Sequence, residues 1–271
     1  AASILLDGAT ELKNVPRLMD TLTMVRMLNA LGIRTEYHQN NTVKIWNNKK
    51  IRHIAPYELV TAMRASFFVA GPLLAKTGFA KVPLPGGCSI GSRPINLHLK
   101  GFKQLGATVS IEHGFVDLKA KKLKGARIYL DFPSVGATEN IMMAGCFAEG
   151  QTLIENAARE PEIIDLGNFL IKAGAKISGL GTSVITVNET SSLKGITYTT
   201  LPDRVEAGTI LLAGAITGGD VTVTKTNPID LEPLTQKLKE CGFELNFTKD
   251  SVRIRSNNDI INPVDIETLP F

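Results

Sequence analysis

The chain has 271 residues, of which 44% are apolar and 21% are charged, a balance typical of a folded globular protein rather than a disordered one. Its formal net charge of +4 is too small to indicate a nucleic-acid partner, and no basic stripe with interleaved aromatic residues occurs. The longest apolar runs, at 67–75 and 210–216, are much shorter than the roughly 20 residues that cross a bilayer. We therefore expect neither a nucleic-acid partner nor a membrane segment.

The chain shows an internal repeat, which we take in order from the N-terminus. Four segments each contain an amphipathic helix followed by two short alternating strands. A proline stands near the start of each helix, and the helices end at glycines about 70 residues apart, namely Gly32, Gly106, Gly174 and Gly242. The repeat therefore predicts four copies of one structural unit.

The other half of each unit is an apolar helix followed by a strand. Apolar helices are predicted over 58–75, 138–149 and 204–217, and they are rich in alanine and glycine. Because these helices are apolar nearly all round, we expect them to be buried and closely packed. Each unit is thus predicted to run strand, helix, strand, helix, strand, strand, with one helix inside.

The second unit carries an insertion, "PGGCSIGSRP" at 85–94. From the glycine that ends the apolar helix to the one that ends the outer helix, the second unit spans 28 residues (78–106), whereas the third spans 24 (150–174) and the fourth 23 (219–242). The excess falls on this glycine-rich segment, which the repeat does not need. Long loops on a rigid scaffold often carry function.

Two interpretations of Cys88 in this segment stay open. It is flanked by small residues, with Lys81 and Arg93 nearby in sequence, and these cations would favour its thiolate. Cys88 is thus either a reactive nucleophile or acid, or an exposed free thiol in a turn. The spacing to Arg93 is C-x4-R, one residue short of the C-x5-R loop of cysteine phosphatases, which excludes that motif. His98, one turn into the next helix, has a possible functional role, but the pattern favours a solvated helix position.

The other cysteines and the histidines indicate no further chemistry. Cys146 and Cys241 occupy apolar helix positions and are expected to be small core residues. An odd cysteine count without a C-x-x-C pair argues against disulfides and favours a reducing, cytoplasmic setting. The four histidines show no metal-ligand spacing, so no metal and no cofactor is predicted.

Polar groups gather at the predicted starts of the apolar helices, in 134–139 and 201–209, while Arg64 lies inside the first. Helix N-termini present free N–H groups and a positive dipole end, which suits phosphate. Asp203 and Arg204 are either a helix-capping pair or ligand contacts.

Several of these motifs together carry a family resemblance. "MRAS", "PGGCSIGSRPINLH", "PSVGATEN", "NAAREPEIIDL" and "LPDRVEAGT", in this order and spacing, resemble the enolpyruvyl transferases, and among them the UDP-N-acetylglucosamine 1-carboxyvinyltransferases of peptidoglycan synthesis. The resemblance covers essentially the whole chain. The shikimate-pathway enolpyruvyl transferases share the fold but not this cysteine loop, and they remain an alternative.

The resemblance implies an α/β architecture of two domains. In each, three βαβαββ units form an inverted α/β barrel with helices inside and sheets outside, and substrates bind in the cleft between the domains. Residues 1–200 would be the first domain, with its first unit incomplete, and 201–271 one unit of the second.

Family members are longer, so we expect this chain to be truncated at both ends and to lack a Lys-Asn pair, an aspartate and later arginines of the active site. A non-catalytic binding or structural fragment is therefore a second hypothesis.

The resemblance also implies a reaction. The 3′-hydroxyl of UDP-N-acetylglucosamine adds to C2 of phosphoenolpyruvate while C3 is protonated, and loss of phosphate leaves the enolpyruvyl ether. Cys88 matches the cysteine that acts in this protonation and is alkylated by fosfomycin, and Arg93 matches the arginine that closes over the ligands.

The remaining matches are to the nucleotide sugar. Asn96 departs from the acidic residue common at its position, which changes the charge of that contact. Pro94, Ile95, Asn96 and Leu97 match the segment that holds the uridine. Arg64 matches a contact to the nucleotide sugar, and Ser134, Val135 and Gly136 match backbone contacts to the diphosphate.

Overall fold

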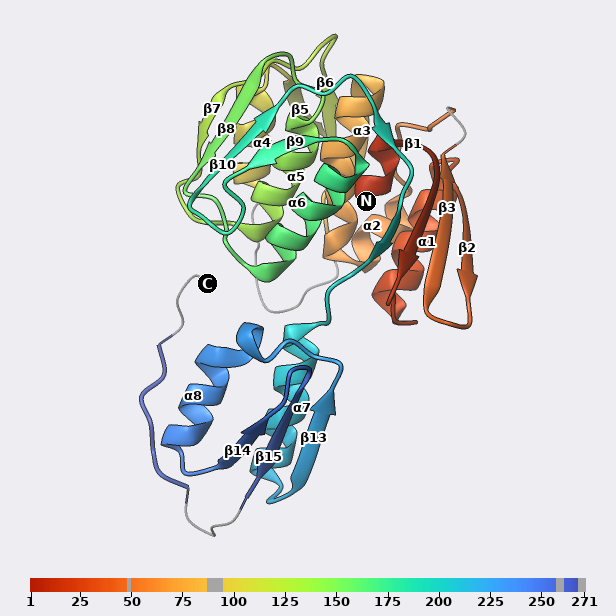
Figure 1. Ribbon diagram of the computed structural model, residues 1–271. Coiled ribbons are helices and arrows are strands. Elements are labelled where there is room, and N and C mark those ends of the chain that lie inside the picture. Colours follow the sequence, from red (N-terminus) through yellow and green to blue (C-terminus); the bar gives the residue numbers. More distant parts are fainter. Residues whose placement is uncertain (48–49, 87–94, 257–260, 268–271) are drawn as a thin grey trace. The chain divides into compact units, whose positions relative to one another are not determined.

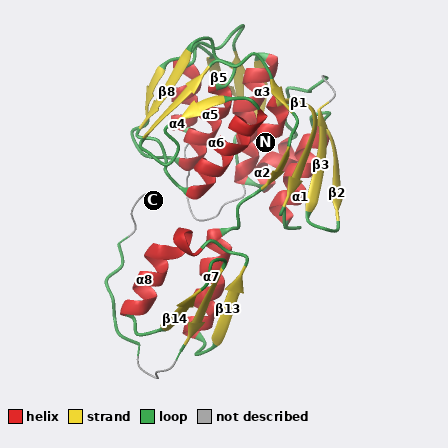
Figure 2. Cartoon of the chain, in the orientation of Figure 1, coloured by secondary structure: helices red, strands yellow, loops and turns green. Residues whose placement is uncertain are grey.

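The computed structural model describes residues 1–47, 50–86, 95–256 and 261–267. The chain divides into two compact units, Ala1–Thr200 (unit 1) and Leu201–Pro270 (unit 2), and each is described by itself. Helices and strands alternate along both units (Figures 1 and 2). The predicted mixed α/β class is confirmed.

The described residues of unit 1 contain eight α- or 3₁₀-helical elements, with strands between them. In chain order its elements are η1 (Ala2–Leu5), β1 (Leu6–Lys13), α1 (Met19–Ala30), β2 (Arg34–His38), β3 (Thr42–Asn47), α2 (Tyr57–Ala62), η2 (Arg64–Val69), α3 (Ala70–Thr77), β4 (Phe79–Pro83), α4 (Asn96–Gln104), β5 (Thr108–Glu112), β6 (Phe115–Lys119), β7 (Arg127–Tyr129), α5 (Val135–Gly145), β8 (Gln151–Glu155), α6 (Pro161–Ala173), β9 (Lys176–Ser178), β10 (Val184–Asn188), β11 (Leu193–Lys194) and β12 (Thr197–Thr199).

The strands of unit 1 form sheets with a repeated order. Within the described residues these run β4-β6-β5, β7-β8-β10-β9 and β11-β1-β3-β2, with β12 also paired to β1. The same pairing recurs in all three sheets. The strand that precedes an outer helix (β4, β8 or β1) pairs antiparallel with the last strand of its repeat (β6, β10 or β3). That last strand also pairs antiparallel with the strand that follows the helix (β5, β9 or β2). Side chains alternate as the sequence predicted, and Val82 and its partner Val116, for example, are both buried.

The end of unit 1 returns to its beginning. β11 pairs in parallel with β1, with Leu6 opposite Leu193, and β12 continues this pairing, with Leu12 opposite Tyr198. β7 has the same parallel relation to β8 in the next sheet. A strand from the last repeat thus completes the sheet that holds the first strand of the chain.

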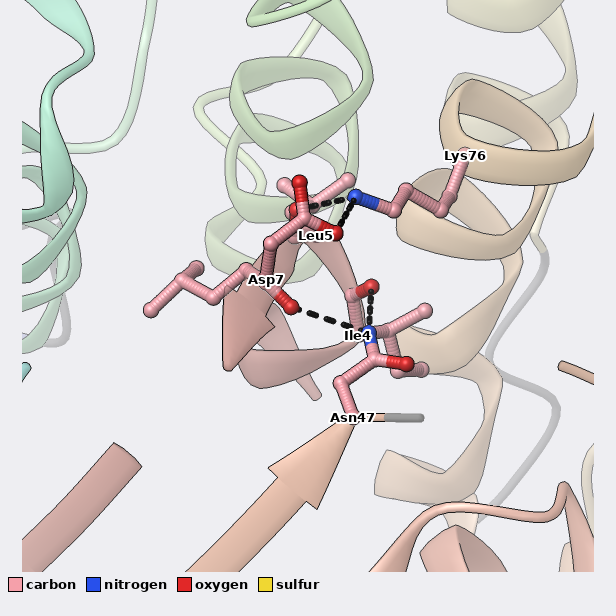
Figure 3. Close-up of polar contacts among 6 residues, drawn as sticks. Ile4, Leu5, Asp7, Asn47 and Lys76 are labelled. Atoms are coloured by element: carbon pink, nitrogen blue, oxygen red, sulfur yellow. Dashed lines mark hydrogen bonds and ion pairs between the residues drawn. The ribbon is translucent and has the colours of Figure 1, made fainter. Parts of the chain in front are cut away.

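Side-chain hydrogen bonds hold the N-terminal segment in place (Figure 3). Lys76 of α3 donates from Nζ to the Leu5 carbonyl oxygen at 3.0 Å and forms an ion pair of 2.8 Å with Asp7. At the end of β3, Asn47 Nδ2 donates to the Ile4 carbonyl oxygen at 2.8 Å. These contacts satisfy backbone oxygens in a buried segment, where an unpaired carbonyl would cost stability.

Two helices of unit 1 are enclosed by protein. α5 has no exposed residue, and in α3 only the last residue, Thr77, is exposed. A Cβ placed on Gly71 of α3 would lie only 2.4 Å from the Asn140 carbonyl oxygen of α5. The small side chain allows the two backbones to approach closely. The predicted burial of the helix over 138–149 is confirmed.

The single helix predicted over 58–75 is wrong. The chain is extended at Met63 (φ −143°, ψ 120°), which separates α2 from η2, and α3 begins only at Ala70. Pro72 explains the late start, because its ring would clash with the Phe68 carbonyl in a longer α-helix and is tolerated only in a first turn. Arg64 therefore begins η2 instead of lying inside a helix.

The glycines that mark the outer helices adopt the left-handed conformation typical of helix ends. Their φ angles are +88°, +90°, +115° and +99° at Gly32, Gly106, Gly174 and Gly242. The predicted ends of all four outer helices are confirmed.

Unit 2 repeats the same plan once. Its elements are α7 (Arg204–Ile216), β13 (Asp220–Thr224), η3 (Pro228–Leu231), α8 (Glu232–Glu240), β14 (Glu244–Phe247) and β15 (Ser251–Arg255), and its sheet runs β13-β15-β14. The sheet and α8 cover one side of α7, with Leu211, Leu238 and Ile254 in the core.

The prediction that the helix over 204–217 is buried all round is wrong for the other side of α7. Val205, Leu212 and Ile216 are exposed there. Unit 2 supplies a single sheet and one outer helix, and neither covers this second apolar side.

Candidate functional site

The structure describes seven of the ten predicted site residues. Ile95 is the N-cap residue of α4, and Asn96 and Leu97 open that helix. Arg64 opens η2, and Ser134, Val135 and Gly136 form the start of α5. Cys88, Arg93 and Pro94 lie outside the described residues, as does most of the insertion at 85–94.

The N-terminus of α5 has the features of an anion site. Ser134 caps the helix, and its Oγ accepts a hydrogen bond of 3.3 Å from Ala137 N. The N–H groups of Val135 and Gly136, in the first turn, have no acceptor within a helix. They lie at the positive end of an eleven-residue helix dipole.

His98, in the first turn of α4, lies beside this N-terminus. A Cβ placed on Gly136 would lie 3.2 Å from Cε1 and 3.4 Å from Nε2 of His98, and 2.9 Å from Phe68. Only glycine leaves the ring in its present place. The structure thus brings the starts of α4 and α5 together.

The predicted solvated position of His98 is wrong, because the residue is only 5% exposed. Its ring packs edge-to-face on Phe67, with centroids 5.3 Å apart, and its Nδ1 lies 3.0 Å from Asn140 Nδ2. Burial, and secondly the positive charge of Arg64, lower the pKa of His98 to about 4. The imidazole is therefore neutral at pH 7, and the Arg64 charge is close enough to act on it.

Asn140 is a polar residue that the sequence analysis did not single out. It is fully buried in α5 and lies within the quoted motif "PSVGATEN". Gly71 N donates to its Oδ1 at 2.9 Å, and its Nδ2 donates to the Phe67 carbonyl oxygen at 3.3 Å. A polar residue in an apolar helix was the available signal, but its partners are 73 and 69 positions away in sequence.

Glu139, also missed, lies next to Asn140 with no hydrogen-bond partner for its buried Oε2 among the described residues. Burial first, and then the carboxylates of Glu162 and Glu160, raise its pKa to about 8, while the Ala1 amino group opposes this. Glu139 is thus largely protonated at pH 7.

The other candidates have structural roles. Cys146 is buried, and burial raises the pKa of its thiol to about 12, so it is an unreactive core residue as predicted. Cys241 is only half-buried at the end of α8. Asp203 caps α7, because its Oδ1 accepts from Val205 N at 2.8 Å and Glu206 N at 3.0 Å.

No group of three His, Cys, Asp or Glu side chains within the described residues has the arrangement of a metal site. Among the helices of these residues, none has the length and apolar character to span a membrane.

Comparison with known sequences gives one consistent picture. The family model for EPSP synthase (3-phosphoshikimate 1-carboxyvinyltransferase) matches residues 1–271. The chain is 50% identical over 273 residues to UDP-N-acetylglucosamine 1-carboxyvinyltransferase 2 of Carboxydothermus hydrogenoformans, covering 100% of this chain and 65% of that protein. It is also 50% identical over 266 residues to UDP-N-acetylglucosamine 1-carboxyvinyltransferase 1 of a bovine Staphylococcus aureus strain, covering 97% and 63%. The chain thus spans about 65% of the length of the curated relatives it matches.

Solved structures agree on the fold. The enolpyruvyl transferase NikO from Streptomyces tendae superposes with a TM-score of 0.86 at 21% identity, covering 97% of this chain and 63% of that one. EPSP synthase from Acinetobacter baumannii superposes with a TM-score of 0.69, also at 21% identity, covering 94% and 61%.

Proposed function

The chain belongs to the EPSP synthase family, and from this premise we propose that the complete protein transfers the enolpyruvyl group of phosphoenolpyruvate to the 3′-hydroxyl of UDP-N-acetylglucosamine. The observation that carries the proposal is 50% identity, over the whole chain, to relatives named for that reaction. The reaction would serve peptidoglycan synthesis in the cytoplasm, with phosphoenolpyruvate and UDP-N-acetylglucosamine as substrates and no cofactor.

We further propose that unit 1 is the family's first domain and unit 2 the first repeat of its second domain. The enclosed helices α3 and α5, and the pairing of β11 and β12 with β1, support an inverted barrel with helices inside and sheets outside for unit 1. The exposed apolar side of α7 is what one repeat without its neighbours would leave.

The nucleotide sugar is proposed to bind at the starts of α4 and α5. Ser134, Val135 and Gly136 would hold the diphosphate at the helix N-terminus, with Arg64 adding a positive charge. Ile95, Asn96 and Leu97, with Pro94, would hold the uridine. Of these residues Asn96 is exposed and so accessible to a ligand.

In the chemical step, Cys88 would protonate C3 of phosphoenolpyruvate as the sugar hydroxyl adds to C2 and gives up its own proton to a general base. Loss of a proton from C3 and of phosphate from C2 then regenerates the double bond as an enol ether. Arg93 would stabilise the phosphate, for which a guanidinium fork is well suited. A general acid of this kind contributes roughly 100-fold or more to the rate.

The test is phosphate release from phosphoenolpyruvate by the complete protein, with either UDP-N-acetylglucosamine or shikimate 3-phosphate as acceptor. We expect release only with the nucleotide sugar, and alkylation of Cys88 by fosfomycin. Release that needs shikimate 3-phosphate would favour the alternative activity of the family, and release without any acceptor would refute both.

Replacing Cys88 separates chemistry from folding. Because the insertion lies outside the repeat, Cys88→Ser is expected to lower turnover roughly 100-fold or more while the thermal midpoint stays unchanged. A large drop in that midpoint would contradict the proposal. Calorimetry with these 271 residues tests the second hypothesis, since binding of UDP-N-acetylglucosamine without turnover would identify a non-catalytic binding fragment.

A further inference from the structure

The hydrogen bonds around Asn140 determine where the proton of His98 sits. Gly71 N is a backbone donor, so the Asn140 atom that it contacts at 2.9 Å must be the amide oxygen. The remaining atom of the amide is therefore the nitrogen, a donor with two hydrogens. It directs these to the Phe67 carbonyl oxygen at 3.3 Å and to His98 Nδ1 at 3.0 Å. Nδ1 must then be an acceptor, and the proton of the neutral ring is on Nε2.

Among the described residues, the hydrogen bond of the His98 ring is the one at Nδ1, and Nε2 is not one of the fully buried side-chain atoms that lack a partner. It belongs to a side chain that is only 5% exposed, and it faces Gly136 in the first turn of α5. A donor that is held in place on a nearly buried side chain, but is not itself sealed off, is available to a ligand. The donor therefore lies beside the first turn of α5, to which the N–H groups of Val135 and Gly136 also belong.

The surroundings of the ring favour an anion as the partner. The α5 dipole, its free N–H groups, the Arg64 charge and the Nε2–H group all present positive potential. A phosphate oxygen would accept from several of these donors at once.

We propose that His98 is a specificity-determining hydrogen-bond donor for a diphosphate at the N-terminus of α5, and that Asn140 is a positioning residue that keeps the His98 proton on Nε2. This inference rests on the proposed function only in taking the diphosphate to belong to a nucleotide sugar. A neutral donor that is already oriented adds directional recognition to the charge of Arg64, which a mobile cation alone would not provide.

The first experiment observes the proton directly in the complete protein. Long-range ¹H–¹⁵N correlation spectra of ¹⁵N-histidine-labelled protein at pH 7 should show His98 with a protonated Nε2 and an unprotonated Nδ1. In Asn140→Ala, we expect the His98 signals to shift towards a mixture of tautomers. A proton on Nδ1 in the unaltered protein, or an unchanged spectrum in Asn140→Ala, would overturn the inference.

The second experiment compares UDP with uridine, which lacks the diphosphate. His98→Leu should weaken UDP binding roughly 10- to 100-fold and leave uridine binding unchanged, because a hydrogen bond to a charged group is lost. His98→Gln, whose amide nitrogen can donate from a similar position, should recover most of the affinity. His113→Leu, in the exposed turn between β5 and β6, is the matched control and should bind both ligands normally.

Failure of this inference and of the proposed function are distinguishable. Equal losses of UDP and uridine binding in a folded His98→Leu protein, or no loss of either, would overturn the role of His98 even if the enzyme turns over. Absence of turnover with a selective loss of UDP binding would leave that role intact and refute only the reaction. If His98→Leu does not fold, the position of the His98 proton in the NMR spectra and the affinity of His98→Gln for UDP test the inference instead.

Discussion

Helices α5 and α7 occupy the same place in their repeats but have different surroundings. Both are capped by a side-chain oxygen, from Ser134 and Asp203, that accepts from a backbone N–H three residues on. With these caps aligned, Ile141 of α5 corresponds to Ile210 of α7. Ile141 is 0% exposed, whereas Ile210 is 43% exposed. The same contrast holds two residues further on, in Met143 at 2% and Leu212 at 47%.

The difference shows that burial of the inner helix is a property of the assembly of repeats and not of one repeat. A single repeat covers one side of its helix, as the core of unit 2 shows, and the neighbouring repeats of unit 1 cover the rest. Repeat proteins gain stability from such interfaces between neighbours. Unit 2 is therefore expected to be the less stable part of these 271 residues, and paired substitutions in the two helices test this.

The largest contrast is expected from a charge at the matched isoleucines. Ile141→Lys buries an ammonium group in the closed core and should destabilise unit 1 by at least about 4 kcal/mol. Ile210→Lys places the same group in solvent and should change the stability of unit 2 by no more than about 0.5 kcal/mol. Trp46, the single tryptophan of the chain, lies in β3 and reports unfolding of unit 1 by fluorescence, while amide exchange in β13 and β15 reports unit 2.

The same pair sharpens the comparison in the complete protein. If further repeats cover α7 there, Ile210→Lys should become as damaging as Ile141→Lys. A mild effect in both contexts would contradict the proposed barrel for the second domain.

Close helix packing gives a second, smaller contrast. A Cβ on Gly71 would lie 2.4 Å from a backbone oxygen of α5, which cannot move without separating the helices, so Gly71→Ala should cost about 3 kcal/mol. A Cβ on Gly208 of α7 would meet the ends of two flexible side chains, Leu234 at 2.9 Å and Leu231 at 3.7 Å. Because alanine also favours the helix, Gly208→Ala should change stability by less than about 1 kcal/mol. Urea unfolding followed by Trp46 fluorescence and by amide exchange measures both, and equal losses would argue against the difference in packing.

The residues that sequence alone predicted are those whose structure is determined locally. Gly32 and its three counterparts mark helix ends because a left-handed residue is needed there whatever the surroundings. Met63 was misassigned because the break depends on how η2 and α3 pack, which no periodicity records. His98 was misassigned for the same reason, since its partner Asn140 is 42 residues away.

The site was predictable to a similar extent. The starts of α4 and α5 were identified from their sequence motifs, but their proximity, and the contact of His98 with Gly136, follow only from the tertiary fold. For α7, the apolar pattern indicates that all sides are meant to be covered but does not specify by what. Cys88 lies outside the described residues, so its part in the site stays a prediction.

The smallest expected effect separates the two units by their response to pH. Glu139 has a pKa raised to about 8 by burial and neighbouring carboxylates, while in α7 the matched position is Gly208, which cannot titrate.

Below about pH 4.5 the carboxyl group of Glu139 is protonated in both the folded and the unfolded protein and has no effect on stability. As the pH rises towards 8, only the unfolded protein releases this proton readily, so the group destabilises unit 1 progressively. Glu139→Gln should therefore stabilise unit 1 increasingly as the pH rises towards 8 and by almost nothing at pH 4. Thermal unfolding followed by Trp46 fluorescence over this range measures the change, with the exposed Glu149→Gln as a control that should show no such trend. A constant gain at all pH values would mean that the substitution acts through packing and not through the buried charge, whereas amide exchange in unit 2 should be the same in both proteins throughout.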